Sequence, residues 1–293
     1  MTTDASPAVQ VLEEACRAVG LDAAGAEPLR IAENQIWRLP GRVVARIARP
    51  GQDDAAAREV RVARWLAEHE VSAVRAYPVE QPVQAGGRPV TFWEELPEHR
   101  HGAVRDVAGA LKQLHSLPAP PFDIGYLDPF VRVSERIDAA VTLSAGDRAW
   151  LHQRRTDLEA QWRVRPRGMA DRAVHGDAWV GNIARTASGP VLMDLERFSI
   201  GPPEWDLVST AVKLTTTGGV TQLEYTEFCE AYGTDVTTWE GYPLMAAARE
   251  LRMTTYAAQH AATRPEWQAE AQHRVDCLRG RSAPRPWVWK GIV

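Results

Sequence analysis

Residues 174–198 read VHGDAWVGNIARTASGPVLMDLERF and carry three polar side chains at defined intervals. Asp177 is followed five residues later by Asn182 and, twelve residues after that, by Asp194. Apolar residues flank each of them, and Gly189–Pro190 predicts a turn between two short strands. Two adjacent loops would therefore bring two carboxylates and one amide into one cleft.

This set of side chains suits phosphoryl transfer, which needs a group that orients the attacking hydroxyl and oxygen ligands that hold Mg²⁺ on the nucleotide phosphates. The spacing matches the catalytic loop of protein kinases, in which an Asp, an Asn and a later metal-binding Asp occur in this order. We therefore predict that Asp177 is the base and that Asn182 and Asp194 bind the metal. A pair of polar surface turns is the alternative, but three such residues in this order disfavour it.

Three segments carry a resemblance to a known family. HGDAWVGN at 175–182, MDLERF at 193–198 and GPPEWDL at 201–207 are similar to the aminoglycoside phosphotransferase and choline kinase family. Its members are small-molecule kinases with a protein-kinase-like fold. The resemblance covers about residues 28–281 and is strongest over 174–208.

The resemblance implies an α+β fold with two lobes. The small lobe, residues 1–97, would combine an antiparallel sheet with a helix and bind the nucleotide. The large lobe, residues 98–293, would be mostly helical and hold the catalytic loop, the metal site and the acceptor pocket. Periodicity predicts strands at 29–39, 42–48, 79–83 and 89–95 and helices at 53–68, 104–117, 131–143, 145–162, 204–217, 221–232, 243–262 and 265–279.

Composition limits the classes of protein to consider. The chain has 293 residues, 45% of them hydrophobic, which is ample for a buried core, and its net charge of −4 gives no bulk attraction to nucleic acid or anionic membrane. Cys16, Cys229 and Cys277 lie far apart without metal-ligand spacing, which favours a reducing compartment. No signal peptide and no run long enough to span a membrane are apparent. We expect a cytoplasmic protein that binds neither nucleic acid nor membrane.

A kinase-like site usually pairs a strand Lys, which binds phosphate, with a helix Glu. Arg46 occupies the strand position here and Glu59 is its candidate partner, although Arg and Lys are not interchangeable. A solvent-facing Arg and an ordinary helix Glu are the alternative. Residues 31–37 lack the glycines that would close a loop over phosphates, so Asn34 would contact phosphate with its amide. Glu95, at the end of the last predicted strand of the small lobe, is a further candidate at the nucleotide site.

Three more residues near the motif receive roles from the resemblance. Glu196 would help at the metal, or pair with Arg197 or another cation. His175 would support the catalytic loop through a backbone hydrogen bond. Asp206 would be buried and brace that loop from the start of a helix.

The expected activity is transfer of a γ-phosphoryl group from ATP or GTP, with Mg²⁺, to a hydroxyl of a small molecule. An aminoglycoside-like or other antibiotic, choline, a sugar and a peptide hydroxyl all remain open as acceptors. A non-catalytic, pseudokinase-like nucleotide-binding module is the other class of function, and the oligomeric state is open. Acids that would suit a polycationic acceptor recur on one helix, although a solvated face explains them better, and a later helix offers alternative pocket residues. The first set is Glu224, Glu227 and Glu230 on the helix, followed by Asp235, and the second is Tyr256, Gln259 and His260.

Overall fold

The computed structural model describes residues 7–31 and 34–291, and the chain forms two compact units. The first unit comprises Met1–Gly102, Pro120–Ile124 and Gly181–Phe198, and the second comprises Ala103–Ala119, Gly125–Val180 and Ser199–Val293. Asp177 therefore belongs to the second unit, whereas Asn182 and Asp194 belong to the first. The assignment of nucleotide binding to residues 1–97 and of catalysis to residues 98–293 stays a prediction.

The first unit contains an antiparallel sheet in the order β1-β2-β3-β5-β4. Its strands are β1 (Glu27–Ile31), β2 (Gln35–Leu39), β3 (Val43–Ile47), β4 (Val83–Ala85) and β5 (Arg88–Glu94). The single strand predicted over 29–39 is wrong, because the chain reverses there and Ile31 pairs with Gln35. Asn34, a turn-favouring residue, lies in this connection, while Ala32 and Glu33 lie outside the described residues. The predicted hairpin over Gly86–Gly87 is present, although β4 begins four residues later than expected.

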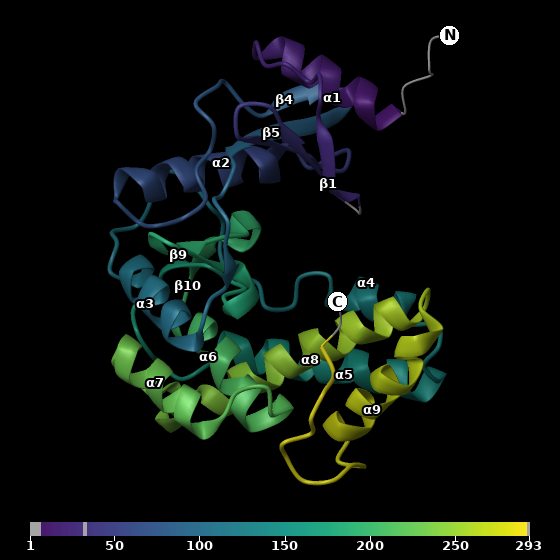
Figure 1. Ribbon diagram of the computed structural model, residues 1–293. Coiled ribbons are helices and arrows are strands. Elements are labelled where there is room, and N and C mark those ends of the chain that lie inside the picture. Colours follow the sequence, from purple (N-terminus) through teal and green to yellow (C-terminus); the bar gives the residue numbers. More distant parts are fainter. Residues whose placement is uncertain (1–6, 32–33, 292–293) are drawn as a thin grey trace. The chain divides into compact units, whose positions relative to one another are not determined.

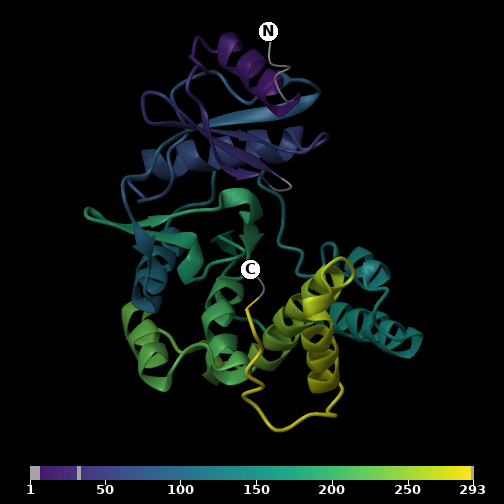
Figure 2. The same cartoon turned by 45° about the vertical axis from the view of Figure 1, so that its right-hand side comes forward.

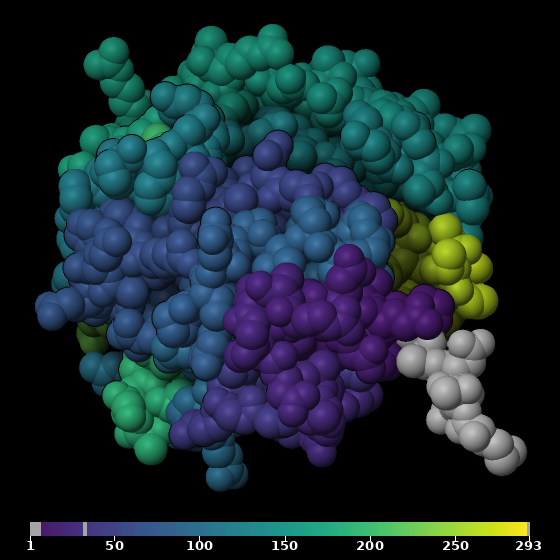
Figure 3. Space-filling view, turned by 90° about the horizontal axis from the view of Figure 1, so that it is seen from above, coloured from purple at the N-terminus to yellow at the C-terminus, as the bar shows by residue number. Residues whose placement is uncertain are grey.

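Successive side chains of the central strand β3 point to opposite faces of the sheet. Val43, Ala45 and Ile47 enter the core that also contains Leu12 and Cys16 of α1 (Pro7–Ala18). Arg46 faces the other way, toward α2 (Asp53–Glu68), with which it forms an ion pair. The two helices thus cover opposite faces of the sheet (Figures 1 and 2). Figure 3 shows the outer surface of the α1 side in purple.

A second, three-stranded sheet of the first unit carries the later part of the motif. It consists of β6 (Arg100–His101), β8 (Ile183–Thr186) and β9 (Gly189–Leu192), in the order β6-β8-β9. The turn predicted at Gly189–Pro190 is wrong, because both residues pair within the sheet. Since β9 is an edge strand, a proline without an N–H group is tolerated there. The turn is formed instead by the preceding two residues, 187–188.

The second unit is mainly helical and contains one pair of short strands, β7 (Arg172–Val174) and β10 (Ser199–Gly201). Its helices are α3 (Val104–His115), α4 (Val133–Ala139), α5 (Ala145–Arg163), α6 (Glu204–Val212), α7 (Gln222–Tyr232), α8 (Tyr242–Ala261) and α9 (Gln268–Leu278). The helix predicted over 204–217 ends at Val212 and continues as a π-helical turn, Lys213–Thr217. Within residues 7–31 and 34–291, no helix is long and apolar enough to cross a membrane.

Candidate active site

The loop that carries Asp177 follows β7 and is held by its backbone. The N–H groups of His175 and Gly176 donate hydrogen bonds of 2.7 and 2.8 Å to the two carboxylate oxygens of Asp206. The Trp205 indole N–H donates to the carbonyl oxygen of Gly176 at 3.1 Å. Gly176 has a φ of 82°, a conformation that side chains rarely adopt, so a glycine is required at this turn. Asp206 and Trp205 therefore hold the backbone of this loop in place without a ligand.

Asp206 is fully buried and acts as the anchor of this loop. His115 Nε2 lies 3.2 Å from its Oδ2, in addition to the two backbone donors. Burial raises the pKa of Asp206, but the hydrogen bond from His115 and the nearby His115, His175 and Arg249 outweigh it, so the pKa lies below its ordinary value. The predicted contact between His175 and the loop backbone is present, because the N–H of Asp177 donates to His175 Nδ1 at 3.2 Å.

Asp177 itself presents its carboxylate at the surface of the second unit, with its side chain 48% exposed. Arg249, a buried residue of α8, lies 3.6 Å from Oδ1 and donates hydrogen bonds to the carbonyl oxygens of Gly176 and Trp205. The guanidinium also stacks 4.2 Å above the Trp205 ring. Arg249 thus joins α8 to the loop and places a fixed positive charge beside the predicted base.

Lys213 adds a second cation to this group. Its Nζ lies 4.4 Å from the ring centroid of Trp179, which is 40% exposed. Burial lowers the pKa of Lys213 to about 8; Asp177 opposes this shift and Arg249 adds to it. Asp177, Trp179, Lys213 and Arg249 are called the Asp177 cluster below.

In the first unit, Arg46 connects two carboxylates. Its NH1 lies 2.6 Å from Oε2 of Glu59, as the predicted pairing requires, and its NH2 lies 3.1 Å from Oε2 of Glu196. Burial raises the pKa of Glu59 to about 7, with Asp194 and Glu196 adding to this shift and Arg46 opposing it. Glu196 therefore pairs with a cation, Arg46, which the sequence had left open as a cation other than Arg197. Its predicted help at a metal stays a prediction.

Asn182 and Asp194 lie on either side of the β8–β9 hairpin. The backbone N–H of Met193 donates to the carbonyl oxygen of Asn182 at 2.9 Å, which ties the ends of the two loops together. Asp194 is exposed and has a φ of 56°, an uncommon conformation that Asp tolerates better than most residues. No cluster of three or more His, Cys, Asp or Glu side chains suited to a metal ion occurs in the part of the chain that the structure describes. One amide and one carboxylate are nonetheless an adequate protein share for Mg²⁺, which takes its other ligands from phosphates and water.

The further candidates predicted from the sequence include Asn34, Glu95 and the acids of α7. Asn34 is half-buried in the β1–β2 connection. Glu95 follows β5 and accepts a 2.6 Å hydrogen bond from Nε of Arg38. The acids of α7 lie on an exposed helix face, where Glu224 caps the helix by accepting from the N–H of Thr221. This arrangement is the solvated face that the sequence favoured.

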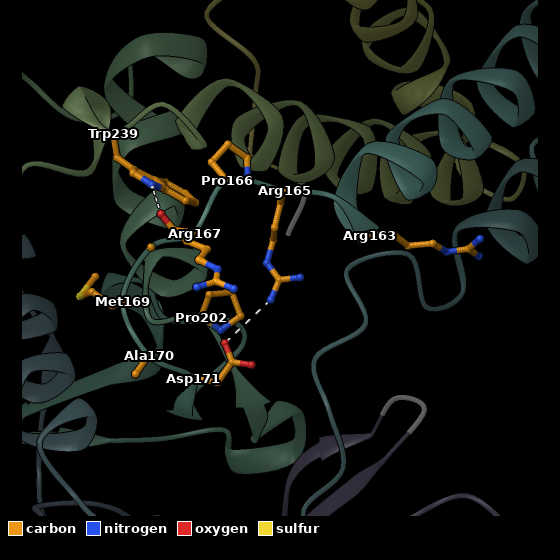
Figure 4. Close-up of a pocket in the computed structure, with 10 residues that line it drawn as sticks. Arg163, Arg165, Pro166, Arg167, Met169, Ala170, Asp171, Pro202 and Trp239 are labelled. Carbon is orange, nitrogen blue, oxygen red and sulfur yellow. Dashed lines mark hydrogen bonds and ion pairs between the residues drawn. The ribbon is translucent and has the colours of Figure 1, made fainter.

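A cavity of about 350 Å³ in the second unit lies beside the residues that lead into β7, before the Asp177 loop (Figure 4). Arg163, Arg165, Arg167 and Trp239 are among its lining residues. Arg165 lies 3.8 Å from Asp171, and the carbonyl oxygen of Arg167 accepts a hydrogen bond from the Trp239 indole. The lining contains none of the residues predicted for the site.

Comparisons with known proteins identify the family of the chain. The model of the phosphotransferase enzyme family matches residues 26–251. The chain belongs to this family. The predicted family is therefore confirmed, and a comparison with curated proteins gave no match.

Solved structures with the same fold include several kinases. An amicoumacin kinase in complex with AMP-PNP, Ca²⁺ and amicoumacin has a TM-score of 0.68 and 14% identity, over 89% of this chain and 92% of that one. Choline kinase LicA from Streptococcus pneumoniae has a TM-score of 0.65 and 16% identity, over 94% and 100%. An aminoglycoside phosphotransferase from Streptomyces rimosus has a TM-score of 0.58 and 17% identity, over 85% and 99%. The predicted protein-kinase-like α+β fold is confirmed.

Sequence reasoning missed three residues of the second unit, namely His115, Lys213 and Arg249. One signal was available, because Lys213 is the single charged residue in an otherwise uncharged run from Leu207 to Leu223. A lone charge in such a run has either a partner or a function. His115 and Arg249 gave no comparable signal, since both stand at ordinary helix positions.

Proposed function

We propose that this phosphotransferase moves the γ-phosphoryl group of a nucleoside triphosphate, ATP in the first instance, to a hydroxyl of a small molecule in the cytoplasm. The observation that carries the proposal is the half-exposed carboxylate of Asp177 on a loop anchored by Asp206, Trp205 and Arg249. A base that must orient a hydroxyl has to be accessible and rigidly held. Asp177 meets both conditions.

In this mechanism the acceptor hydroxyl donates a hydrogen bond to Asp177, which takes up the proton as the oxygen attacks the γ-phosphorus. Asn182 and Asp194 would hold Mg²⁺, which neutralises phosphate charge when bound. Arg46, kept in position by Glu59, would contact the nucleotide phosphates. Glu196 shares Arg46 with Glu59, so release of Glu196 would make one edge of the guanidinium available to phosphate.

The test of the proposal is a screen with Mg²⁺ and ATP, then GTP, against aminoglycosides, choline, sugars and hydroxyl-bearing peptides. The expected result is a nucleotide-dependent mass gain of one phosphate on one acceptor class. Nucleotide binding without any product across the panel would favour the non-catalytic binding module. An antibiotic acceptor would make the reaction one of drug inactivation.

Asp194→Ala is expected to remove most of the Mg²⁺-dependent gain in nucleotide affinity, and Asn182→Ala to weaken it less. The reason is charge, since Asp194 offers a full carboxylate and Asn182 an amide oxygen. Calorimetric titration of AMP-PNP with and without Mg²⁺ measures the gain. Asp54→Ala, at an exposed position of α2 in the same unit, is the matched control. An unchanged Mg²⁺ gain in Asp194→Ala would refute the metal assignment.

Arg46→Ala is expected to raise the nucleotide KM and lower kcat together, because the contact both binds and orients the phosphates. Arg46→Lys should recover part of the loss, since it restores the charge without the bidentate fork. Glu59→Ala should act as a milder form of Arg46→Ala, and the double variant should be little worse than Arg46→Ala. Steady-state kinetics decide this, with Arg64→Ala on the exposed face of α2 as control. Wild-type constants in Arg46→Ala would exclude the phosphate contact.

A further inference from the structure

The Asp177 cluster contains one cation, Lys213, whose amine has no polar ligand among the residues that the structure describes. Lys213 begins a π-helical turn, a local distortion often found at functional sites. Its Nζ lies over the Trp179 ring, and within residues 7–31 and 34–291 no hydrogen bond or ion pair joins that amine to another group. Lys213 is half-buried, and an ammonium group that loses part of its hydration is stabilised by a hydrogen-bond acceptor, so the amine is suited to an acceptor from outside the protein.

The charges around Lys213 determine the kind of acceptor. Asp177 and Arg249 are the charged groups that act on it. Arg249 already makes two hydrogen bonds to backbone carbonyl oxygens and lies 3.6 Å from the Asp177 carboxylate. Arg249 also lies near the buried carboxylate of Asp206, whereas the carboxylate that acts on Lys213 is that of Asp177, which Arg249 shares. The missing ligand is therefore an anion, and it belongs next to the group that orients the acceptor hydroxyl.

We propose that Lys213 is an anion-binding catalytic residue of the Asp177 cluster and that its ligand is the phosphoryl group in transfer. The inference rests on the proposed function. A phosphoryl group attacked by a hydroxyl bound to Asp177 must pass within a few ångströms of that carboxylate, where its charge spreads over three oxygens. Lys is a compact point charge on a flexible stem, and the Trp179 ring holds it by a cation–π contact until the phosphoryl group arrives.

The step balances without a further reactant. The acceptor oxygen forms a bond to the γ-phosphorus, and the bond from that phosphorus to the bridging oxygen breaks, which releases the nucleoside diphosphate. The hydroxyl proton passes to Asp177. Lys213 keeps its proton throughout and acts only by its charge and its N–H donors.

The small number of lysines permits a direct measurement of the pKa of Lys213. The chain contains three, Lys112, Lys213 and Lys290, so reductive methylation with ¹³C-formaldehyde gives three lysine NMR signals besides that of the terminal amine. Lys→Arg variants assign them. Titration with pH in the presence of Mg²⁺ and AMP-PNP is expected to raise the pKa of Lys213 by on the order of one unit, because a nearby anion stabilises the ammonium. The signals of Lys112 and Lys290 serve as internal controls and should not move.

ADP and inorganic phosphate show whether the anion bound by Lys213 is the terminal phosphate of the nucleotide or a free phosphate. Mg²⁺ with ADP should move Lys213 less than AMP-PNP, which assigns the effect to the terminal phosphate. If Lys213 responds to inorganic phosphate but not to AMP-PNP at calorimetric saturation, Lys213 binds anions but the transferred phosphoryl group is not its ligand, and the proposal is overturned. If it responds to neither, the proposal is overturned. Failure of AMP-PNP to bind would count against the proposed function instead, and inorganic phosphate would still decide the role of Lys213.

Kinetics with the acceptor found in the screen give an independent readout. Lys213→Met is expected to lower kcat on the order of 10²-fold, as for loss of one group that stabilises transition-state charge, and Lys213→Arg to restore part of it. The wild-type kcat/KM should fall as the pH rises through about 8, where Lys213 of the free enzyme loses its proton, and this alkaline decline should be absent in Lys213→Met. Lys112→Met, at an exposed position of α3, is the control. An unaltered kcat and pH profile in Lys213→Met would exclude the role.

Discussion

Asp177→Asn is expected to lower kcat by about 10²–10⁴-fold while leaving nucleotide affinity near that of the wild type. Asn has nearly the same shape as Asp, but it does not take up the proton that the attacking hydroxyl must lose. The loop itself should stay in place, because its hydrogen bonds with Asp206, Trp205 and Arg249 run through backbone groups of the neighbouring residues, although the 3.6 Å ion pair between Arg249 and Asp177 is lost.

Two measurements separate loss of chemistry from loss of structure. Calorimetric titration of AMP-PNP reports nucleotide affinity, and thermal unfolding reports whether the loop and its neighbours remain folded. Asp157→Asn, at an exposed position of α5 in the same unit, makes the same chemical change away from the loop and should keep full activity. A wild-type kcat in Asp177→Asn would show that Asp177 is not the base.

Local periodicity placed Arg46 on a strand and Glu59 on the following helix, but the pairing itself was expected from the charge pair that a kinase-like site requires. The strand over Val43–Ile47 alternates apolar residues with Arg46, and the following helix repeats apolar residues at helical spacing around Glu59. A central strand packed on an adjacent helix then leaves few other partners for either charge. The second carboxylate on Arg46 was not predictable in this way, since Glu196 is 150 residues from Arg46 in the chain.

The Asp177 cluster shows where sequence patterns stop being informative. Trp179, Lys213 and Arg249 come from a loop, a π-helical turn and a helix, and each lies more than 30 residues from the next. Periodicity assigns faces within an element, but it does not say which faces of distant elements meet. The prediction of a turn at Gly189–Pro190 failed for a related reason. Gly-Pro usually indicates a turn, but an edge strand of a sheet also accepts proline, and the sequence does not show which strand is at the edge.

Asp206→Asn is expected to reduce both stability and kcat, because one side chain holds the loop and satisfies buried donors. Asp206 accepts from the N–H groups of His175 and Gly176 with separate oxygens. Asn supplies one oxygen and replaces the other by an NH₂ group, so one buried N–H would lose its acceptor and face another donor. An unsatisfied buried group costs about 1–3 kcal/mol, and loss of a charged partner beside His115 adds to this.

The pH dependence of this loss follows from the lowered pKa of Asp206. A carboxyl whose pKa is lower in the folded than in the unfolded protein stabilises the fold above the ordinary value of 3.8, and that contribution disappears as the pH falls through the lowered pKa. The part of the difference in unfolding free energy between the wild type and Asp206→Asn that comes from the Asp206 charge should therefore be complete above about pH 5 and shrink in stronger acid. Denaturant unfolding at several pH values measures it.

If Asp206 had a structural role only, Asp206→Asn would lower stability and leave kcat unchanged. If Asp206 anchors the catalytic loop, the substitution must also lower kcat. At a temperature where both proteins are fully folded, kcat of Asp206→Asn should still fall, since a shift of the Asp177 loop misplaces the base relative to the hydroxyl. Asp147→Asn is the matched control, because Asp147 is another buried carboxylate of this unit, paired with Arg279 at 2.6 Å and outside the Asp177 cluster. Loss of stability in both variants, with loss of kcat confined to Asp206→Asn, would identify the buried carboxylate under the loop as the group that keeps Asp177 in its catalytic position.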